Sequence, residues 1–291
     1  YKHAGIFSHG LAPVANGEYW GFIDRSGEFV IQPQFVCEPD AFSENFAFCR
    51  SNNRDSGIID REGNWKATNF SSYTNPFQFY DGYALALSHE SEPMCYVDSS
   101  GELCFGKSFS HASSFSEERA IVIEKDDSNL MGFIDTSGNY ILTPQADIAC
   151  PFHEGLAFIH STAFTGFIDK NGQQVFSIKA PIDYSFYSRT EVFIQPSYGF
   201  LRVEDGCVFV PFEKDSSKLL DTKGKVVFDF AKIEKEYGTV LYAHGGKEKF
   251  AITKKNGNYH FIDFKGKTIA DPRLCFSISI IDSNDNCLYS V

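Results

Sequence analysis

One short motif recurs seven times along the chain: two apolar residues, an Asp, and a Gly three residues after that Asp. The spacings from one Asp to the next are 36, 38, 37, 34, 52 and 42 residues. A period of about 20–50 residues is typical of an array built from one supersecondary unit. The seven pairs, which number repeats 1 to 7, are Asp24 and Gly27, Asp60 and Gly63, Asp98 and Gly101, Asp135 and Gly138, Asp169 and Gly172, Asp221 and Gly224, and Asp263 and Gly266.

The Asp-x-x-Gly motif predicts a hairpin turn. Asp favours the first position of a type I turn because its carboxylate accepts backbone N–H bonds from the residues that follow. Gly at the fourth position tolerates a positive φ, which closes a three-residue loop with a G1 bulge. In this register Asp24 lies opposite Glu28, and Ile23 lies opposite Phe29. All fourteen Asp and Gly residues are therefore assigned structural roles in turns.

A second element precedes each hairpin: an aromatic or apolar residue, a short polar stretch, and then an apolar run that contains Ala. It occupies residues 7–12, 42–47, 79–84, 115–120 and 152–157, with weaker copies at 203–208 and 249–252. His9 and His153 fall in its variable middle, which we interpret as solvated loop. Each unit is thus predicted to be a three-stranded antiparallel meander, with the Ala strand first and the two hairpin strands after it.

The apolar pair before each Asp indicates how the units are arranged. Successive residues of a strand point to opposite faces, so a pair such as Phe22 and Ile23 buries both faces of the second strand. Sheets stacked repeat upon repeat satisfy this pattern. We expect an all-β array of about seven three-stranded antiparallel units of ~36–38 residues, by the repeat spacing. A propeller-like ring is favoured, and an open β-solenoid is the alternative.

Seven units lie within the usual range for a propeller, and small Ala residues suit a crowded inner strand. Against a ring, a four-stranded blade usually needs about 40–45 residues. Residues 1–291 are expected to form a single domain, because the repeats run from end to end without a linker. Its hairpins are expected near residues 20–31, 57–67, 95–105, 132–143, 166–176, 218–228 and 260–270. Residues 275–291 resemble the start of an eighth unit, so we expect a fragment of a longer protein.

Composition excludes several classes of partner. The net charge is −12 and the isoelectric point is near 5.1, which argues against binding to nucleic acid or anionic membranes. No apolar run approaches the roughly 18 residues of a spanning helix, so membrane insertion is not expected. The eight Cys form no C-x-x-C pair. Cys95 and Cys104 flank one hairpin but fall on opposite faces, so free thiols and a cytoplasmic or other reducing compartment are favoured, with export left open.

No cofactor, metal or catalytic site is expected. The chain has no G-x-S-x-G, G-x-G-x-x-G, phosphate-loop or H-E-x-x-H motif. The turn Asp residues recur once per unit, whereas Ca²⁺ needs about six to eight oxygens around one ion. Trp20 and Trp65 fall where neighbouring repeats should pack, so both are expected to fill the core.

The segments Trp20–Gly27 and Val30–Phe35 together resemble the bacterial WG-repeat family. Gly132–Gly138, Ile141–Gln145 and Phe152–Ala157 form a second close match, and Gly166–Asp169 a third. The Trp-Gly pair itself is intact only at Trp20 and Gly21. Later copies carry Ser56, Met94, Met131, Thr165, Ser217 and Tyr259 in place of Trp, and Cys95, Lys218 and His260 replace Gly in three of them. The resemblance implies a non-enzymatic bacterial β-repeat with binding roles and supplies no catalytic residues.

The 52-residue step between Asp169 and Asp221 marks an insertion of about 15 residues. Insertions in repeat arrays often form the binding face, and Tyr with Arg is typical of interface anchors. A strand pair that pads one unit is the alternative. A smaller insertion around Asp229–Gly238 predicts a short helix that ends at the Gly. The predicted partner-contact residues are Tyr184, Phe186, Tyr187, Arg189 and Tyr198.

Three functions follow, in order. The first is a non-enzymatic scaffold that binds a protein or peptide within a bacterial protein. The second is a glycan or cell-wall recognition module of an exported protein. The third is an enzyme.

Overall fold

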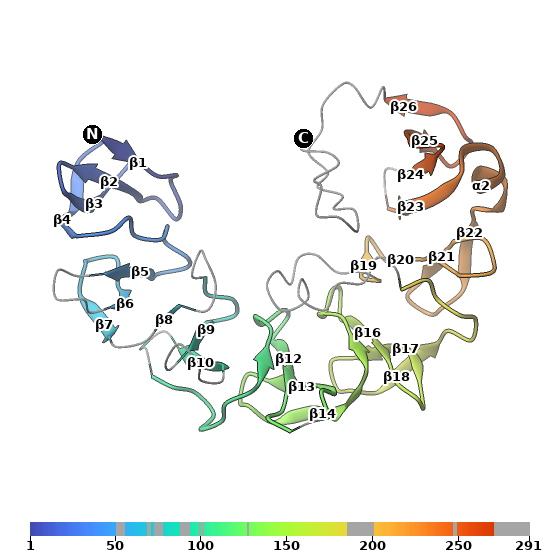
Figure 1. Ribbon diagram of the computed structural model, residues 1–291, viewed down its shortest axis with the longest axis horizontal. Coiled ribbons are helices and arrows are strands. Elements are labelled where there is room, and N and C mark those ends of the chain that lie inside the picture. The colour runs from blue at the N-terminus through green and yellow to red at the C-terminus, as the bar shows by residue number, and fades with distance from the viewer. Residues whose placement is uncertain are drawn as a thin grey trace. The chain divides into compact units, whose positions relative to one another are not determined.

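The computed structural model describes residues 1–50, 56–68, 71–72, 78–87, 94–98, 100, 102–126, 128–184, 201–246 and 249–270. Within these residues seven small antiparallel sheets follow one another in chain order, one for each Asp-x-x-Gly motif (Figure 1). The chain divides after Gln145 into an N-terminal part with four sheets and a C-terminal part with three. The predicted all-β array of about seven antiparallel repeats is confirmed. Closure into a ring and the assignment of 1–291 to a single domain stay predictions.

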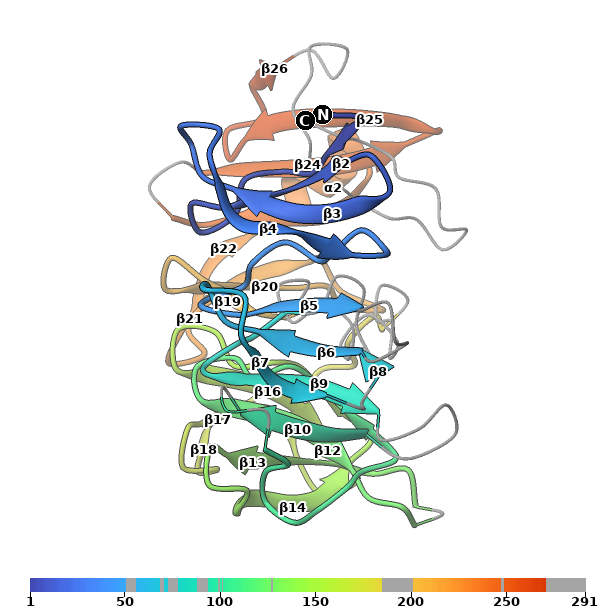
Figure 2. The same ribbon diagram turned by 90° about the vertical axis from the view of Figure 1, so that its left-hand side faces the viewer.

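The N-terminal part contains the first four sheets, whose neighbouring strands can be followed in Figure 2. Its strands are β1 (His3–Ala4), β2 (Ala12–Asn16), β3 (Tyr19–Ile23), β4 (Phe29–Phe35), β5 (Ala47–Arg50), β6 (Ser56–Ile59), β7 (Trp65–Thr68), β8 (Ser71–Ser72), β9 (Tyr83–Leu87), β10 (Met94–Asp98), β11 (His111–Ala112), β12 (Arg119–Ile123), β13 (Met131–Asp135) and β14 (Tyr140–Ala146).

The C-terminal part contains repeats 5 to 7 and the helix α2. Its elements are β15 (Ile148–Ala149), β16 (Leu156–His160), β17 (Thr165–Asp169), β18 (Gln174–Ser177), β19 (Val203–Glu204), β20 (Cys207–Val210), β21 (Lys218–Asp221), β22 (Val226–Asp229), α2 (Ala231–Tyr237), β23 (Thr239–His244), β24 (Phe250–Lys255), β25 (Asn258–Asp263) and β26 (Thr268–Ala270). Helix α2 ends at Gly238, which has φ 84°, as the sequence predicted.

The predicted meander is present in these sheets, and most of them gain a further strand. The Ala strand pairs with the first hairpin strand in every repeat, as in Ala12 opposite Ile23 and Ala157 opposite Ile168. Five of the seven described sheets have four strands, not three. In three of these five the added first strand, β1, β11 or β15, is only two residues long. Such a short strand leaves no periodic pattern that sequence could reveal.

The Asp-x-x-Gly turns have the predicted geometry. Oδ1 of Asp135 accepts the N–H groups of Ser137 and Asn139, each at 2.9 Å. Ile23 lies opposite Phe29, and the pairing shifts between Phe22 and Ile23, as a bulge requires. Each turn Gly among the described residues has a φ between 76° and 88°, whereas Gly101 lies outside them.

The turn carboxylates make the fold sensitive to acid. The Ser26 hydroxyl holds the pKa of Asp24 below its ordinary value. The backbone N–H groups of Lys225 and Lys267 do the same for Asp221 and Asp263. A carboxyl whose pKa is lower in the folded chain stabilises the fold above its unfolded pKa, about 3.9 for Asp, and this stabilisation is lost on acidification.

We therefore expect the urea midpoint to be steady between about pH 7 and pH 5 and to fall below about pH 4. Changing Asp221 to Asn should flatten the fall for the C-terminal part, because one titrating turn is removed. An equal midpoint at pH 5 and pH 3 in the unaltered chain would contradict this account.

The interior follows the predicted pattern of doubly buried second strands. Both members of the apolar pair are buried in repeats 1 to 6, and in repeat 7 Ile262 is buried while Phe261 is partly exposed. Trp20 and Trp65 pack against the cluster around Phe22 and Phe35, so the prediction that they fill the core is confirmed.

Neighbouring repeats meet at the turn Gly. A Cβ at Gly63 would lie 3.0 Å from Ile31 Cγ2, and one at Gly138 would lie 2.5 Å from Phe105 Cγ. The same holds in the C-terminal part, where a Cβ at Gly224 would lie 2.6 Å from Phe176 Cδ2. Ile31, Phe105 and Phe176 each belong to the repeat before the turn that they touch. The turn Gly is therefore required twice, by its φ and by the side chain packed over it.

The middle of the Phe-x-x-Gly element is not merely solvated loop, and that interpretation is incomplete. Asp81 and Gly82 both have positive φ, as do Glu154 and Gly155, which is the geometry of a two-residue type I′ turn. The carboxylate of one such turn binds the backbone of the next repeat. Asp81 Oδ2 accepts the N–H of Glu118 at 2.7 Å.

Glu154 makes the fullest of these contacts between repeats. Its Oε1 accepts the N–H of Asp205 at 2.6 Å, and its Oε2 accepts the N–H of Gly206 at 2.8 Å. Glu44 reaches the N–H of Gly82 more weakly, at 3.4 Å. In repeat 1 the Nδ1 atom of His9 lies 2.9 Å from the Phe42 carbonyl oxygen. We call this set of contacts the turn ladder.

Candidate functional site

The predicted contact residues fall mostly outside the described part of the chain. Phe186, Tyr187, Arg189 and Tyr198 are not among the described residues. Tyr184 is partly buried, and its ring centroid lies 5.3 Å from that of His160 and 6.5 Å from that of Phe158. Burial raises the pKa of its hydroxyl to about 12. Tyr184 therefore packs against the core of repeat 5, at the start of the insertion.

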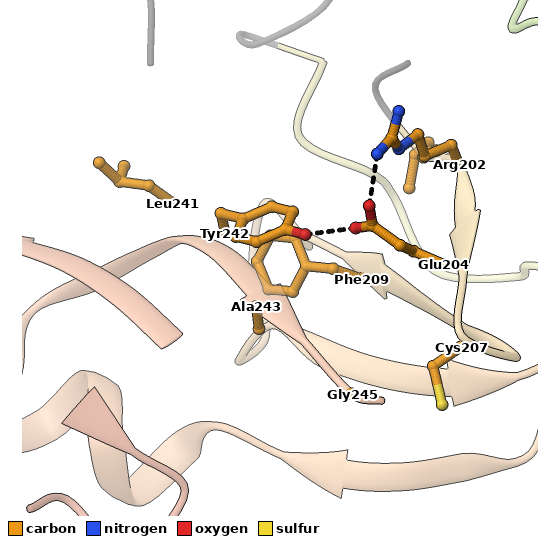
Figure 3. Close-up of a pocket in the computed structure, with 9 residues that line it drawn as sticks. Arg202, Glu204, Cys207, Phe209, Leu241, Tyr242, Ala243 and Gly245 are labelled. Carbon is orange, nitrogen blue, oxygen red and sulfur yellow. Dashed lines mark hydrogen bonds and ion pairs between the residues drawn. The ribbon is translucent and has the colours of Figure 1, made fainter. Parts of the chain in front are cut away.

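A small pocket lies just beyond the other end of the insertion. It is formed by β19 and β20 of repeat 6 and by β23 of repeat 7 (Figure 3). Its volume is about 90 Å³, and its lining residues are Leu201, Arg202, Glu204, Cys207, Phe209, Leu241, Tyr242, Ala243 and Gly245. A cavity of about 150 Å³ holds one benzene molecule. The pocket is therefore large enough for one short aliphatic side chain.

Glu204 is the polar centre of the pocket. Its carboxylate accepts hydrogen bonds from the Tyr242 hydroxyl on one side and the Arg202 guanidinium on the other (Figure 3). Burial opposes ionisation of Glu204, but these two hydrogen bonds outweigh it and hold its pKa below the ordinary value. Burial, and then the bond to Glu204, raise the pKa of Tyr242 well above its ordinary value.

His244 extends this polar cluster toward the turn of repeat 6. Its Nε2 lies 3.2 Å from Asp205 Oδ2, and its Nδ1 lies 3.7 Å from Glu204 Oε2. The His244 ring stacks on Phe250 at a centroid distance of 5.4 Å. Repeats 6 and 7 are thus joined by charged side chains at the place where the turn ladder joins other repeats through main chain.

Local backbone geometry positions these side chains. Asp205 and Gly206 form a turn with positive φ at both residues, which sets Glu204 opposite Cys207. Leu201 has φ 57°, although it is neither Gly nor Asn. A bulky residue in this region costs about 1–3 kcal/mol. Strain of this size is typical of functional sites and lies here at the pocket wall.

The displaced pKa values favour binding over proton transfer. A general acid or base works best with a pKa near the working pH. Burial raises the pKa of the Cys207 thiol, so this group is a poor nucleophile at neutral pH. Tyr242 is displaced upward and Glu204 downward, each away from neutrality.

Two searches of the described residues gave negative results. No group of three or more His, Cys, Asp or Glu side chains there could hold a metal ion. Among the described helices, none is long and apolar enough to cross a membrane.

The sequence did not predict the members of this cluster. Residues 203–208 were recognised as a weak copy of the repeated element, so the turn at Asp205 had a signal. The partners Tyr242 and His244 had none, because they come from the next repeat. Their approach depends on the pairing of β23 with β24, which contains a shift between Val240 and Tyr242.

Removing the Tyr242 hydroxyl should destabilise the C-terminal part. We expect Tyr242→Phe to lower the free energy of unfolding at pH 7 by about 1 kcal/mol, since a partly exposed hydrogen bond to a charged group is lost. The loss should shrink below about pH 4, where Glu204 becomes protonated in the unfolded chain. Tyr19→Phe, at an exposed tyrosine of β3, is the control and should leave urea denaturation unchanged. A Tyr242→Phe loss of equal size at pH 7 and pH 3 would argue against an ionised Glu204.

Two segments of the chain match the family model of the WG containing repeat: residues 20–36 and residues 131–159. They cover the hairpin of repeat 1, and the hairpin of repeat 4 together with the first strands of repeat 5. The resemblance predicted from Trp20–Gly27 and Gly132–Gly138 is confirmed at these segments. They are consistent with degenerate copies of the WG repeat. A comparison with curated protein sequences found no match.

Solved structures give low similarity over most of the chain. A computationally designed protein, Ika8, is 12% identical, with coverage of 91% of this chain and 85% of that chain and a TM-score of 0.42. A eukaryotic initiation factor is 9% identical, with coverage of 92% and 75% and a TM-score of 0.46. BamB from Moraxella catarrhalis is 10% identical, with coverage of 91% and 82% and a TM-score of 0.35. None of these similarities is high enough to bear on function.

Proposed function

We propose that this chain is a non-enzymatic repeat scaffold that binds an extended segment of a protein partner, in a bacterial protein. The observation that carries the proposal is the pocket between repeats 6 and 7. It has room for a single side chain and lies next to the one large insertion of the array. Peptide-binding sites commonly combine a rigid β framework with pockets for individual side chains.

The chemistry of the pocket supports this proposal. Leu201, Phe209 and Leu241 offer apolar contact, while Arg202 and Glu204 form a polar edge. An apolar pocket with few polar groups is typical of a binding site that selects by shape. The predicted anchors Tyr184, Phe186, Tyr187, Arg189 and Tyr198 belong to the insertion that ends beside this pocket, and we propose that they contact the same partner.

The test is selection of peptides on the 291-residue protein from a random display library, followed by measurement of Kd for an enriched peptide. Leu241→Trp should fill the pocket and weaken binding at least tenfold, since Leu241 is only partly buried and a larger side chain has room to project. Tyr187→Ala with Arg189→Ala should also weaken binding about tenfold. The control is Val30→Trp, at an exposed residue of β4, which should leave Kd unchanged.

Unchanged binding in both the pocket and the insertion variants would refute the proposed site. Failure to enrich any peptide, together with retention of the protein on purified peptidoglycan, would replace the proposal with the glycan-recognition alternative.

A further inference from the structure

The turns of repeats 6 and 7 share a charge pattern that the described turns of repeats 1 to 5 lack. Lys occupies the second and fourth positions after the turn Asp in both, as Lys223 and Lys225 and as Lys265 and Lys267. The corresponding pair in repeat 4 is Ser137 and Asn139. All four lysines are exposed. Residues 201–270 hold 13 Lys and Arg against 10 Asp and Glu, although the whole chain has a net charge of −12.

Each of these turns leads into an edge strand with exposed apolar side chains. β22 ends its sheet, and among the described strands only β21 pairs with it. Val226 and Val227 are 47% and 46% exposed, so both faces of the strand meet solvent. In repeat 7 the edge strand β26 exposes Ile269 by 54%. Exposed β-branched residues on an open edge favour addition of another strand.

The two turns belong to one surface. The ring of Phe264, within the turn of repeat 7, stacks on Phe228 of β22 at a centroid distance of 4.4 Å. The Tyr237 hydroxyl at the end of α2 donates to the carbonyl oxygen of Gly266 at 2.8 Å. These contacts hold Lys265 and Lys267 close to β22. We call β22 with the four lysines the basic edge.

We propose that the basic edge binds an acidic, extended segment of a protein partner, which adds to β22 as a further antiparallel or parallel strand. The main chain of β22 supplies hydrogen bonds, Val226 and Val227 contact alternate side chains, and the lysines face the partner's carboxylates. The inference rests on the proposed function, that the chain binds protein segments, and adds the chemistry of one such segment. The basic edge is formed by other residues than the pocket.

The test uses three labelled nine-residue peptides and fluorescence anisotropy with the full 291-residue protein. The first alternates Glu and Val, the second has the same sequence with N-methylated Val residues, and the third replaces Glu by Lys. We expect the first to bind, and the second to bind at least tenfold more weakly, because N-methylation removes the donors needed for strand pairing. The third should bind still more weakly, because its charge is reversed.

Protein variants locate the site. Lys223→Ser, Lys225→Asn, Lys265→Ser and Lys267→Asn together copy the residues of the repeat 4 turn, so the fold should be kept and binding of the acidic peptide should weaken at least tenfold. The control removes four exposed positive charges elsewhere, at Lys2, Arg25, Lys125 and Lys179, each changed to Ser. It should reduce binding less than threefold.

Equal binding of the unmodified and N-methylated peptides would overturn strand addition, and equal losses in the two quadruple variants would overturn the basic edge as the site. Either result leaves the proposed function intact if a display-selected peptide still responds to Leu241→Trp. Loss of both responses would refute the two proposals together.

Discussion

Gly138→Val is expected to destabilise the N-terminal part by about 3–5 kcal/mol. A β-branched residue at φ 76° costs about 1–3 kcal/mol of backbone strain. Its Cβ would also lie 2.5 Å from Phe105 Cγ, and overpacking of this kind costs a further ~1–3 kcal/mol. Phe105 cannot move aside freely, because its ring packs against Tyr83 and Tyr96 at 5.5 and 5.7 Å.

Gly27→Val separates the two causes. Gly27 has φ 88°, but no atom of another residue lies within 4 Å of the position of its Cβ. It should therefore show the strain alone, about 1–3 kcal/mol. Both Trp residues of the chain lie in the N-terminal part, so tryptophan fluorescence during urea denaturation reports on it. Equal losses in the two variants would show that the contact between repeats contributes nothing.

Phe167→Ala should destabilise the C-terminal part by about 3–5 kcal/mol, the usual cost of deleting a buried Phe side chain. Phe167 is fully buried in β17. Its ring lies 4.9 Å from that of Phe176 and 5.6 Å from that of Phe158, so three aromatic residues lose contact at once.

The equivalent residue of repeat 7 provides a matched control. Phe261 precedes its Ile-Asp pair as Phe167 does, but it is partly exposed. Phe261→Ala should therefore cost only about 1–2 kcal/mol, in proportion to the smaller area removed from water. Far-UV circular dichroism during urea denaturation compares the two. A loss at Phe261 as large as that at Phe167 would show that burial does not set the ranking.

The parts of the fold that sequence predicted are those fixed by local chemistry. An Asp followed by Gly specifies its own turn, because the carboxylate binds N–H groups two and four residues on. The short helix was predicted for the same reason, from the Gly that ends it. The buried second strands follow from two adjacent apolar residues, which no half-exposed strand would carry.

The parts that sequence did not predict depend on residues one repeat apart. The acceptor Asp81 and the donor Glu118 are 37 residues apart, and the donor is main chain, so its side chain gives no signal. The pocket likewise needs the spatial register between β20 and β23. The insertion that sequence singled out contributes Tyr184 to the core, and its other predicted contacts still await test.

The turn ladder bears on how such an array can grow. Each joint asks for one carboxylate from a repeat and only for a peptide N–H from the repeat that follows. A peptide N–H is present whatever the side chain, so a repeat copied to a new place brings a working joint with it. The same economy lets side chains elsewhere drift, as the missing Trp residues at Met94 and Thr165 illustrate. Lengthening by duplication and loss of the signature pair are then two outcomes of one device.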